Sequence, residues 1–319
     1  MRKIYCFGEA VYDIIFKNEK PVEAKPGGAM LNVAVTLGRL GLPVYFVGDF
    51  ANDRVGNIIK KFLQDNNVDT TYITMYTNAK SRIALAFLDE KNNADYSFYK
   101  IRIEDKPFIN FPILQQDDIL LYGSYYAIKP EIRAMVSEFV SACRNNNAVI
   151  VYDPNFRQAH LKLLGQLKPY IEENISNADI TKGSDEDFKN IFQTEDAETT
   201  YSVLNNKGCK SMIYTRNRYG VDLHTTNFQN HLPAIGVKPL STVGAGDTFT
   251  AGMAYWLYTN HIDKMKLQQL SLEEYEKMIT TAIEFATDVC KSYDNYVSME
   301  FVSRLKNSSG FPCENKDIL

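Results

Sequence analysis

The feature that most constrains the fold of this chain is a repeated order of short apolar stretch, glycine turn and helical pattern. The first repeat has a predicted strand at residues 3–8 and a predicted helix at residues 29–40, which Gly41 and Pro43 end. Strands that alternate with helices in this way predict a parallel sheet covered by helices. The later repeats place strands at residues 44–48, 119–123, 149–153, 178–182 and 211–215, and helices at residues 55–63, at residues 131–144 and after Ser184.

Two early segments interrupt this order. Between the first strand and Gly27, Pro21 and Pro26 predict a turn. Residues 82–101 contain strand-forming stretches at 82–88 and 96–99 around Lys91-Asn92-Asn93, which predicts a β-hairpin. The hairpin either extends the edge of the main sheet or forms a small sheet that covers a site.

The C-terminal part of the chain is rich in predicted helix. Residues 271–293 predict one long helix, whose pattern is compatible with an interruption, and residues from about 304 to 319 predict a loose tail. In the helix at residues 29–40, the expected buried side contains Leu31, Val35 and one of Leu37 and Leu40. We find no repeat, low-complexity linker or domain boundary, so residues 1–319 are expected to form a single domain.

The composition excludes several classes of protein. A net charge of −4 lacks the basic surface typical of nucleic-acid binding. The five cysteines are scattered without a CxxC pair, which argues against a zinc site or a disulfide framework and is typical of a reducing compartment. Glu9 and Asp13 break the apolar stretch after Arg2-Lys3, and no stretch approaches the roughly 18 apolar residues of a membrane span. We therefore expect a cytoplasmic, soluble protein that binds neither nucleic acid nor a membrane.

A loop of small residues, from Ser241 to Phe249, lies directly before a helical pattern. Apolar residues recur there at helical spacing: Phe249, Met253, Trp256 and Leu257. Gly244 and Gly246 allow the backbone close to a ligand, and unpaired N–H groups at the helix start favour a phosphate. Asp247 is then either an N-cap or first-turn acid of the helix, or a base that takes a proton from a hydroxyl that attacks a phosphoryl group.

Three motifs follow one another along the chain: Gly27-Gly28-Ala29-Met30-Leu31-Asn32-Val33-Ala34 with Leu40-Gly41, then Asp153-Pro154-Asn155-Phe156-Arg157, then Ser241 to Phe249. The first and the last resemble the two signatures of the ribokinase-like (PfkB) carbohydrate kinases. The middle motif is similar to the D-P-N-x-R element of the fructokinase and ketodeoxygluconate-kinase branches. The similarity covers residues 3–300, and the chain looks most like the bacterial fructokinases.

This resemblance implies a ribokinase-like three-layer α/β/α core with a mostly parallel sheet. It also implies a small β lid from residues 14–24 and 82–101, which in many members forms a homodimer interface. The expected reaction is the transfer of a phosphoryl group from ATP to a sugar hydroxyl, helped by Mg²⁺, with fructose as the leading substrate. Asp247 would be the base in this reaction. The amides of Gly244, Ala245 and Gly246 would form the anion hole for the transferred group.

The resemblance also implies a sugar site. Asp13, Gly28 and Asn32 match positions that bind sugar hydroxyls in the family. Considered without the family, Asp13 is a turn residue and Asn32 is a polar position on a helix. A carboxylate and an amide can each bind neighbouring hydroxyls, and a glycine lets the sugar lie against the backbone.

For the nucleotide, Ser184 and Asp187 match the N-x-x-E motif, whose acid acts on Mg²⁺ and phosphate through water. The same two residues fit a capping box at the start of a helix. Thr215 and Gly220 match the T-x-G-x-x-G turn that approaches the phosphates. Arg157 is a candidate contact to substrate phosphate oxygens, and the alternative is a salt bridge that holds its loop.

Departures from the family pattern leave alternatives open. Ser241 stands where Asp usually begins the C-terminal signature, which puts activation by K⁺ in doubt. Ser184 and Asp187 replace Asn and Glu, which shortens the reach toward the metal. Ketodeoxygluconate stays open as substrate, because Lys100 and Arg102 could bind its carboxylate, and so do ribose and nucleosides. A sugar- or nucleotide-sensing protein that kept the fold without catalysis is the alternative outside the enzymes.

Overall fold

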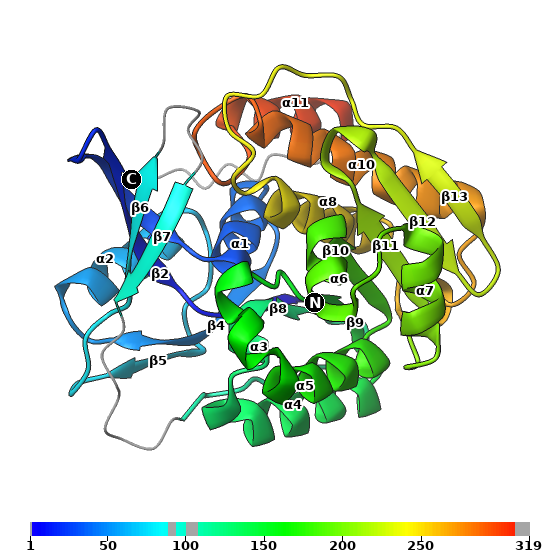
Figure 1. Ribbon diagram of the computed structural model, residues 1–319, viewed down its shortest axis with the longest axis horizontal. Helices are drawn as coiled ribbons and strands as arrows, with labels where there is room; N and C mark the ends of the chain where they lie inside the picture. The colour runs from blue at the N-terminus through cyan, green and yellow to red at the C-terminus, as the bar shows by residue number, and fades with distance from the viewer. Residues whose placement is uncertain (1, 89–93, 100–107, 310–319) are drawn as a thin grey trace.

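The computed structural model describes residues 2–88, 94–99 and 108–309 (Figure 1). Among these residues, nine strands form one sheet in the order β13-β12-β11-β10-β9-β8-β1-β4-β5. Neighbours from β11 to β5 pair in parallel, and β12 and β13 add antiparallel at one edge. The sheet is therefore mostly parallel, as the alternation of strands and helices predicts. Its strands are β1 (Ile4–Phe7), β4 (Val44–Ala51), β5 (Ile73–Tyr76), β8 (Ile119–Gly123), β9 (Val149–Asp153), β10 (Ile180–Ser184), β11 (Ser211–Thr215), β12 (Val221–Thr225) and β13 (Gln229–Leu232).

Helices cover both faces of this sheet. Because successive strand residues point to opposite faces, Ile4 and Cys6 of β1 lie in one apolar core and Tyr5 and Phe7 in the other. The first core also contains residues of α1 (Ala29–Arg39), α2 (Arg54–Asp65), α8 (Ala245–Thr259), α10 (Leu272–Val289) and α11 (Met299–Ser309). The second contains residues of α3 (Ser124–Ala127), α4 (Arg133–Asn145), α5 (Leu164–Asn177), α6 (Asp185–Phe192) and α7 (Ala197–Asn205). The expected three-layer α/β/α core is confirmed.

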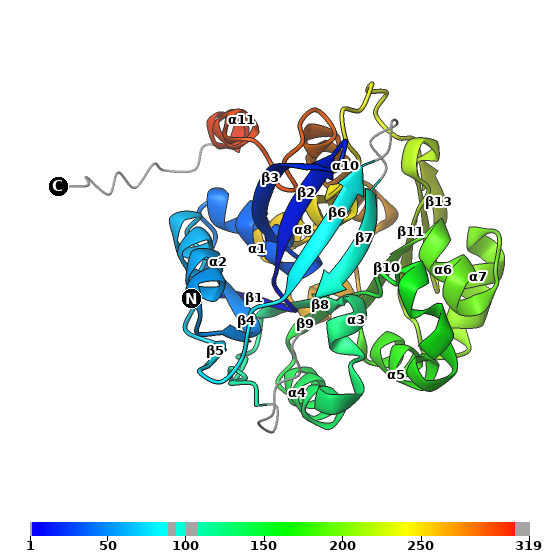
Figure 2. The same cartoon turned by 60° about the vertical axis from the view of Figure 1, so that its left-hand side comes forward.

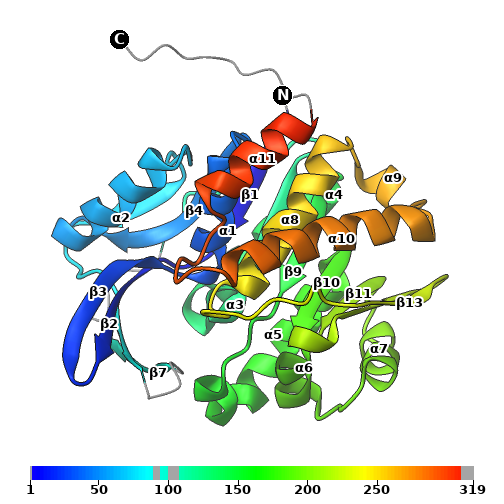
Figure 3. The same cartoon turned by 90° about the horizontal axis from the view of Figure 1, so that it is seen from above.

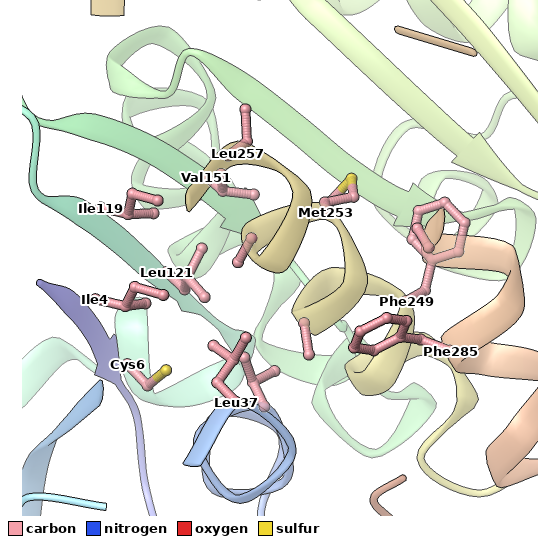
Figure 4. Packing of buried hydrophobic residues seen from close by; sticks show 14 of the residues in the cluster. Ile4, Cys6, Leu37, Ile119, Leu121, Val151, Phe249, Met253, Leu257 and Phe285 are labelled. Carbon is pink, nitrogen blue, oxygen red and sulfur yellow. The ribbon is translucent and has the colours of Figure 1, made fainter. Parts of the chain in front are cut away.

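Helix α8 is held in the middle of the first core. Figure 4 shows Phe249, Met253 and Leu257 of α8 among residues of the sheet, α1 and α10. The helical spacing read from the sequence is confirmed, since these three residues and Trp256 are buried. A Cβ on Gly252 would lie 2.7 Å from Cα of Ala282, so the glycine allows α8 and α10 to pack this closely. The start of α8 is thereby fixed relative to the sheet.

A second sheet lies apart from the first. Its four strands follow the order β3-β2-β6-β7, with β2–β3 and β6–β7 antiparallel and β2–β6 parallel. Figure 2 shows these strands side by side, and Figure 3 shows them beyond the edge of the main sheet. The hairpin expected at residues 82–101 therefore belongs to a separate small sheet, although its predicted turn at 91–93 and residues 100–101 lie outside the described residues. The strands are β2 (Val11–Lys17), β3 (Lys20–Gly27), β6 (Ile83–Leu88) and β7 (Ala94–Tyr99).

The turn predicted at Pro21 and Pro26 is wrong. Both prolines lie in β3, and the chain turns earlier, at Asn18 and Glu19, which have φ angles of 50° and 62°. Strand β3 is at the edge of the small sheet, where proline is tolerated because its missing N–H has no partner to lose. Asp13 accordingly lies in strand β2 and is not a turn residue.

Three helix predictions need correction. Helix α1 is buried on nearly all sides, so Leu37 and Leu40 are both buried. Helix α10 is continuous and ends at Val289, earlier than predicted. Residues 304–309 continue α11, so the loose tail predicted from about residue 304 is wrong there, and residues 310–319 lie outside the described part of the chain. Within the described ranges, no helix combines the length and apolarity needed to span a bilayer.

Candidate active site

The carboxyl ends of the parallel strands share one edge of the main sheet, and the motif residues gather there. Strand β9 ends at Asp153 and leads into the loop that carries Asn155 and Arg157. The neighbouring strand β10 ends at Ser184. Helix α8 begins close to the loop after β9, since Asn155 of that loop donates a hydrogen bond to Asp247 in the first turn of α8. Motifs that are far apart in the sequence therefore form one site.

Asp247 lies in the first turn of α8 and is only 7% exposed. The N-cap position belongs to Gly244, so the first-turn interpretation is confirmed and the N-cap interpretation is wrong. Its carboxylate accepts hydrogen bonds from Asn32 Nδ2 at 2.8 Å and from Asn155 Nδ2 at 3.3 Å. Burial raises the pKa of the Asp247 carboxyl, and it outweighs the hydrogen bond from Asn32 and the positive charge of Arg157, which lower that pKa. The result is a buried carboxylate with a raised proton affinity.

The glycine loop before α8 has little room for side chains. Gly244 has a φ of 81°, and a Cβ on it would lie 2.7 Å from the backbone of Asn295. The N–H of Ala245 donates to the carbonyl of Thr242 at 3.3 Å, a long hydrogen bond within the loop. Gly246 is exposed, and its N–H lies in the first turn of the helix, where no preceding helical carbonyl is available. This geometry suits an anion, because the loop backbone and the positive end of the helix dipole lie together.

Asp13 and Gly28 lie at the base of the small sheet. Gly28 has a φ of 125°, and a Cβ on it would meet the carbonyl oxygen of Glu9 at 2.4 Å. The carboxylate of Asp13 lies against Gly27, since a Cβ added to this glycine would lie 2.0 Å from Asp13 Oδ2. Burial raises the pKa of Asp13 to about 6, although the positive charge of Lys25 acts in the opposite direction. Asp13 accepts no hydrogen bond from the residues that the structure describes, which leaves its oxygens available for hydroxyl groups.

Ser184 and Asp187 form the capping box that their spacing allowed. Asp187 Oδ2 accepts from Ser184 N at 2.8 Å and from Ser184 Oγ at 2.7 Å, and the N–H of Asp187 donates to Ser184 Oγ at 3.1 Å. Asp187 Oδ1 accepts from the N–H of Phe156 at 2.6 Å. The capping box thus also ties α6 to the loop after β9.

Thr215 and Gly220 shape the turn after β11. Thr215 Oγ1 donates to the carbonyl of Gly183 at 3.4 Å. Gly220 has a φ of 93°, and a Cβ there would lie 2.2 Å from the carbonyl oxygen of Leu232. Within the described ranges neither residue is hydrogen-bonded to Asp247, so they form a separate part of the edge. Arg157 is exposed and makes no ion pair with a described residue, which disagrees with the salt-bridge interpretation.

Comparison with known proteins decides the family. A family model described as pfkB family carbohydrate kinase matches residues 1–291. The chain belongs to this family. It is an ATP-dependent sugar kinase. The kinase is 30% identical over 277 residues to "Fructokinase" of Rhizobium leguminosarum bv. trifolii, covering 85% of this chain and 84% of that one. It is 25% identical over 296 residues to "Probable fructokinase-6, chloroplastic" of Arabidopsis thaliana, covering 89% and 75%.

Solved structures share the fold of the kinase. Fructokinase from Vibrio cholerae O395, in its fructose, ADP and calcium ion bound form, aligns with a TM-score of 0.81 at 21% identity over 95% of this chain and 98% of that chain. Aminoimidazole riboside kinase from Salmonella enterica, complexed with aminoimidazole riboside and an ATP analog, gives 0.78 at 20% identity over 96% and 99%. The ribokinase-like fold expected from the motifs is confirmed.

Two features of the kinase site were not predicted from the sequence. The first is the role of Asn155, whose amide reaches Asp247, because a motif does not show which side chains meet. The second is the buried ion pair between Lys182 and Asp153, with Nζ 2.8 Å from Oδ2. A lysine within a buried strand was a usable signal, since lysine is rarely buried without a partner.

Proposed function

We propose that this kinase transfers the γ-phosphoryl group of ATP to a hydroxyl of fructose, with Asp247 as the base. The observation that carries the proposal is the geometry of Asp247. Its carboxylate is buried directly behind the glycine loop and is oriented by Asn32 and Asn155. A carboxylate in this position can accept the proton of a hydroxyl as that hydroxyl attacks the phosphoryl group.

The raised pKa of Asp247 supports this role. General bases work best when their pKa lies closer to the working pH than that of an exposed carboxylate, and burial moves Asp247 in that direction. The loop amides of Gly244, Ala245 and Gly246 would stabilise the charge on the transferred group. For Ala245, this requires its N–H to leave the long contact with Thr242.

The residues present fit an indirect contact to Mg²⁺. Among the described residues, no cluster of three or more histidines, cysteines or acids is placed to hold a metal. Both oxygens of Asp187 accept hydrogen bonds from Ser184 or Phe156, so Asp187 would hold Mg²⁺ through its water ligands. Bound with ATP, Mg²⁺ would neutralise charge on the phosphate oxygens.

The choice of fructose rests on the relatives named fructokinase and on the Vibrio cholerae structure with fructose and ADP bound. Asp13, Gly28 and Asn32 would bind sugar hydroxyls, and Arg157, which has no ion pair among the described residues, would bind a substrate phosphate. Ketodeoxygluconate would need a cation for its carboxylate, and Lys100 and Arg102, named for that purpose, lie outside the described residues. A nucleoside stays the second candidate, since Salmonella enterica aminoimidazole riboside kinase shares the fold.

We further propose that the small sheet serves as a homodimer contact. Val22 of β3 is 59% exposed, Phe87 of β6 is 41% exposed and Tyr99 of β7 is 59% exposed. A second copy would remove these apolar side chains from water. Sedimentation of the purified kinase measures the oligomeric state, and a monomer at micromolar concentration would contradict this contact.

Release of ADP over a panel of fructose, other hexoses, pentoses, ketodeoxygluconate and nucleosides tests the function, run in K⁺ and in Na⁺. We expect the highest kcat/KM with fructose. We also expect a weak response to K⁺, because Ser241 offers a neutral hydroxyl, which binds cations less strongly than a carboxylate. A nucleoside as the best acceptor would overturn the sugar assignment. No acceptor-dependent ADP release would favour the sensing protein.

A further inference from the structure

A buried ion pair lies behind the glycine loop. Lys182, on β10, has a side chain that is 5% exposed, and the side chain of Asp153, at the end of β9, is 1% exposed. The ammonium nitrogen of Lys182 donates to Asp153 Oδ2 at 2.8 Å. Neighbouring parallel strands thus bring opposite charges together at the edge of the sheet that carries the site.

The ion pair also touches the first turn of α8. A Cβ on Gly246 would lie 3.1 Å from Lys182 Nζ, so the ammonium lies directly against the glycine loop. Thr250 Oγ1 lies 3.2 Å from Asp153 Oδ2 and 3.2 Å from the carbonyl oxygen of Gly246. These contacts therefore connect the sheet to the glycine loop directly before Asp247.

The charges around Asp247 show what this ammonium contributes. Asn155 and the exposed cation Arg157 come from the loop after β9, Asn32 comes from α1, and Asp153 comes from β9. Lys182, from β10, is the buried cation among the described groups that act on Asp247. Water and salt screen an exposed charge such as Arg157 far more than a buried one. The negative charge of Asp153 opposes the effect of Lys182 on Asp247, so the two members of the pair act with opposite signs.

A purely structural role does not require these charges. Two apolar residues of similar volume hold neighbouring strands together as well as a buried ion pair does, and often better, because both ions lose hydration on burial. The contact of Lys182 with the Gly246 position gives the pair a second role at the site.

We propose that Lys182 is a positioning residue of the phosphoryl transfer: held by Asp153, its ammonium supports the glycine loop that leads into Asp247. This inference rests on the proposed role of Asp247. It assigns Lys182 no contact with the substrate.

Opposite shifts in the pH profile test this role. In Lys182→Met, Asp247 loses the buried positive charge, so the acidic limb of the kcat/KM profile should move to higher pH. In Asp153→Asn, Asp247 loses a negative neighbour, so the same limb should move to lower pH. A residue that only holds the strands together would lower the melting temperature without moving the limb.

The double variant Lys182→Met/Asp153→Asn is included because the single Lys182 variant leaves a buried, unpaired carboxylate, which alone could prevent folding. In the double variant the limb should return close to that of the wild type. Its kcat should stay roughly 10-fold to 100-fold low, because the ammonium no longer supports the loop. Lys264→Met is the matched control. Lys264 is also a buried lysine, 3.5 Å from Asp179 at the opposite end of β10, and its removal should leave limb and kcat unchanged.

The variants are assayed by ADP release with the best acceptor of the panel, with the melting temperature measured in parallel. A folded double variant whose kcat and acidic limb of the kcat/KM profile both equal those of the wild type overturns the proposal. Single variants whose acidic limbs shift in the same direction also overturn it. Asp247→Asn is run beside them. If it keeps the wild-type rate, the assignment of the base has failed, whereas a large loss there with unchanged Lys182 variants is a failure of this inference alone.

Discussion

Asp13 offers a prediction in which stability and function change in opposite directions. Burial raises the pKa of its carboxyl from 3.8 to about 6, so the folded protein favours the protonated form. The stability that this proton confers is fully present below about pH 3.8 and is lost as the pH rises through 6. At neutral pH the folded protein therefore holds an ionised carboxylate at a cost, and Asp13→Asn should remove that cost.

The size of the effect follows from the shift. A shift of this size corresponds to a ceiling of about 3 kcal/mol, and partial solvent access to Asp13 reduces the expected gain to roughly 1–2 kcal/mol. For a chain of this length the gain corresponds to an increase in melting temperature of about 2–3 °C. It should be constant above pH 7 and vanish below pH 4. The same variant should bind the sugar more weakly, because an amide replaces the acceptor of two hydroxyl protons.

Differential scanning calorimetry of the wild type and Asp13→Asn from pH 4 to pH 8, without sugar, measures the prediction. Asp65→Asn is the control, since Asp65 forms an exposed pair with Lys61 and its removal should change stability by less than about 0.5 kcal/mol. An Asp13→Asn variant that is no more stable than the wild type at pH 8 would refute the reasoning. So would a gain of equal size at pH 4 and pH 8.

Two further substitutions test the geometry of the site. Gly28→Ala should lower the free energy of unfolding by more than about 1 kcal/mol and weaken sugar binding, because the new Cβ meets the carbonyl of Glu9. Gly165→Ala is the control: it has open space around it and should do neither. Melting curves with and without sugar compare the two variants. Ser184→Ala removes an N-cap and one hydrogen bond to Asp187, so it should lower the free energy of unfolding by roughly 1 kcal/mol. It should also raise KM for ATP more than KM for the sugar. Unchanged KM values for both substrates would contradict a nucleotide role for the Ser184–Asp187 capping box.

The sequence predicted those parts of the fold that depend on local patterns. The alternation of strands and helices gave the parallel sheet, and the helical spacing after Gly246 gave α8. The β2–β3 strands were expected only from the family resemblance, which placed a β lid at residues 14–24. The residues themselves predicted a turn there, because prolines in a short segment favour a turn and only the position of β3 at a sheet edge makes them acceptable in a strand. Helix α11 was missed because its polar composition resembles a tail, whereas Phe301 and Val302 fix it to the core.

The site was predictable in part for the same reason. Asp247, the glycine loop and the capping box at Ser184 are contiguous motifs, so spacing alone indicated them. The contacts of Asp247 with Asn32 and Asn155 join segments that are 215 and 92 residues apart, and nothing local encodes such pairs. The pairing of Lys182 with Asp153 likewise follows from the neighbourhood of β9 and β10, which only the order of the strands in the sheet determines.

The most direct test of the account is the rate of phosphoryl transfer in Asp247→Asn. The variant keeps the shape of the side chain and an oxygen for the hydrogen bond from Asn32, but it cannot accept the substrate proton. We expect kcat for ADP release to fall by roughly 10²–10⁴-fold, while calorimetry shows sugar affinity within a few fold of the wild type. Asp118→Asn, at a buried acid that binds the N–H groups of Lys3 and Gln115, should leave kcat nearly unchanged. A kcat of Asp247→Asn within about tenfold of the wild type would contradict the role of Asp247 as the base.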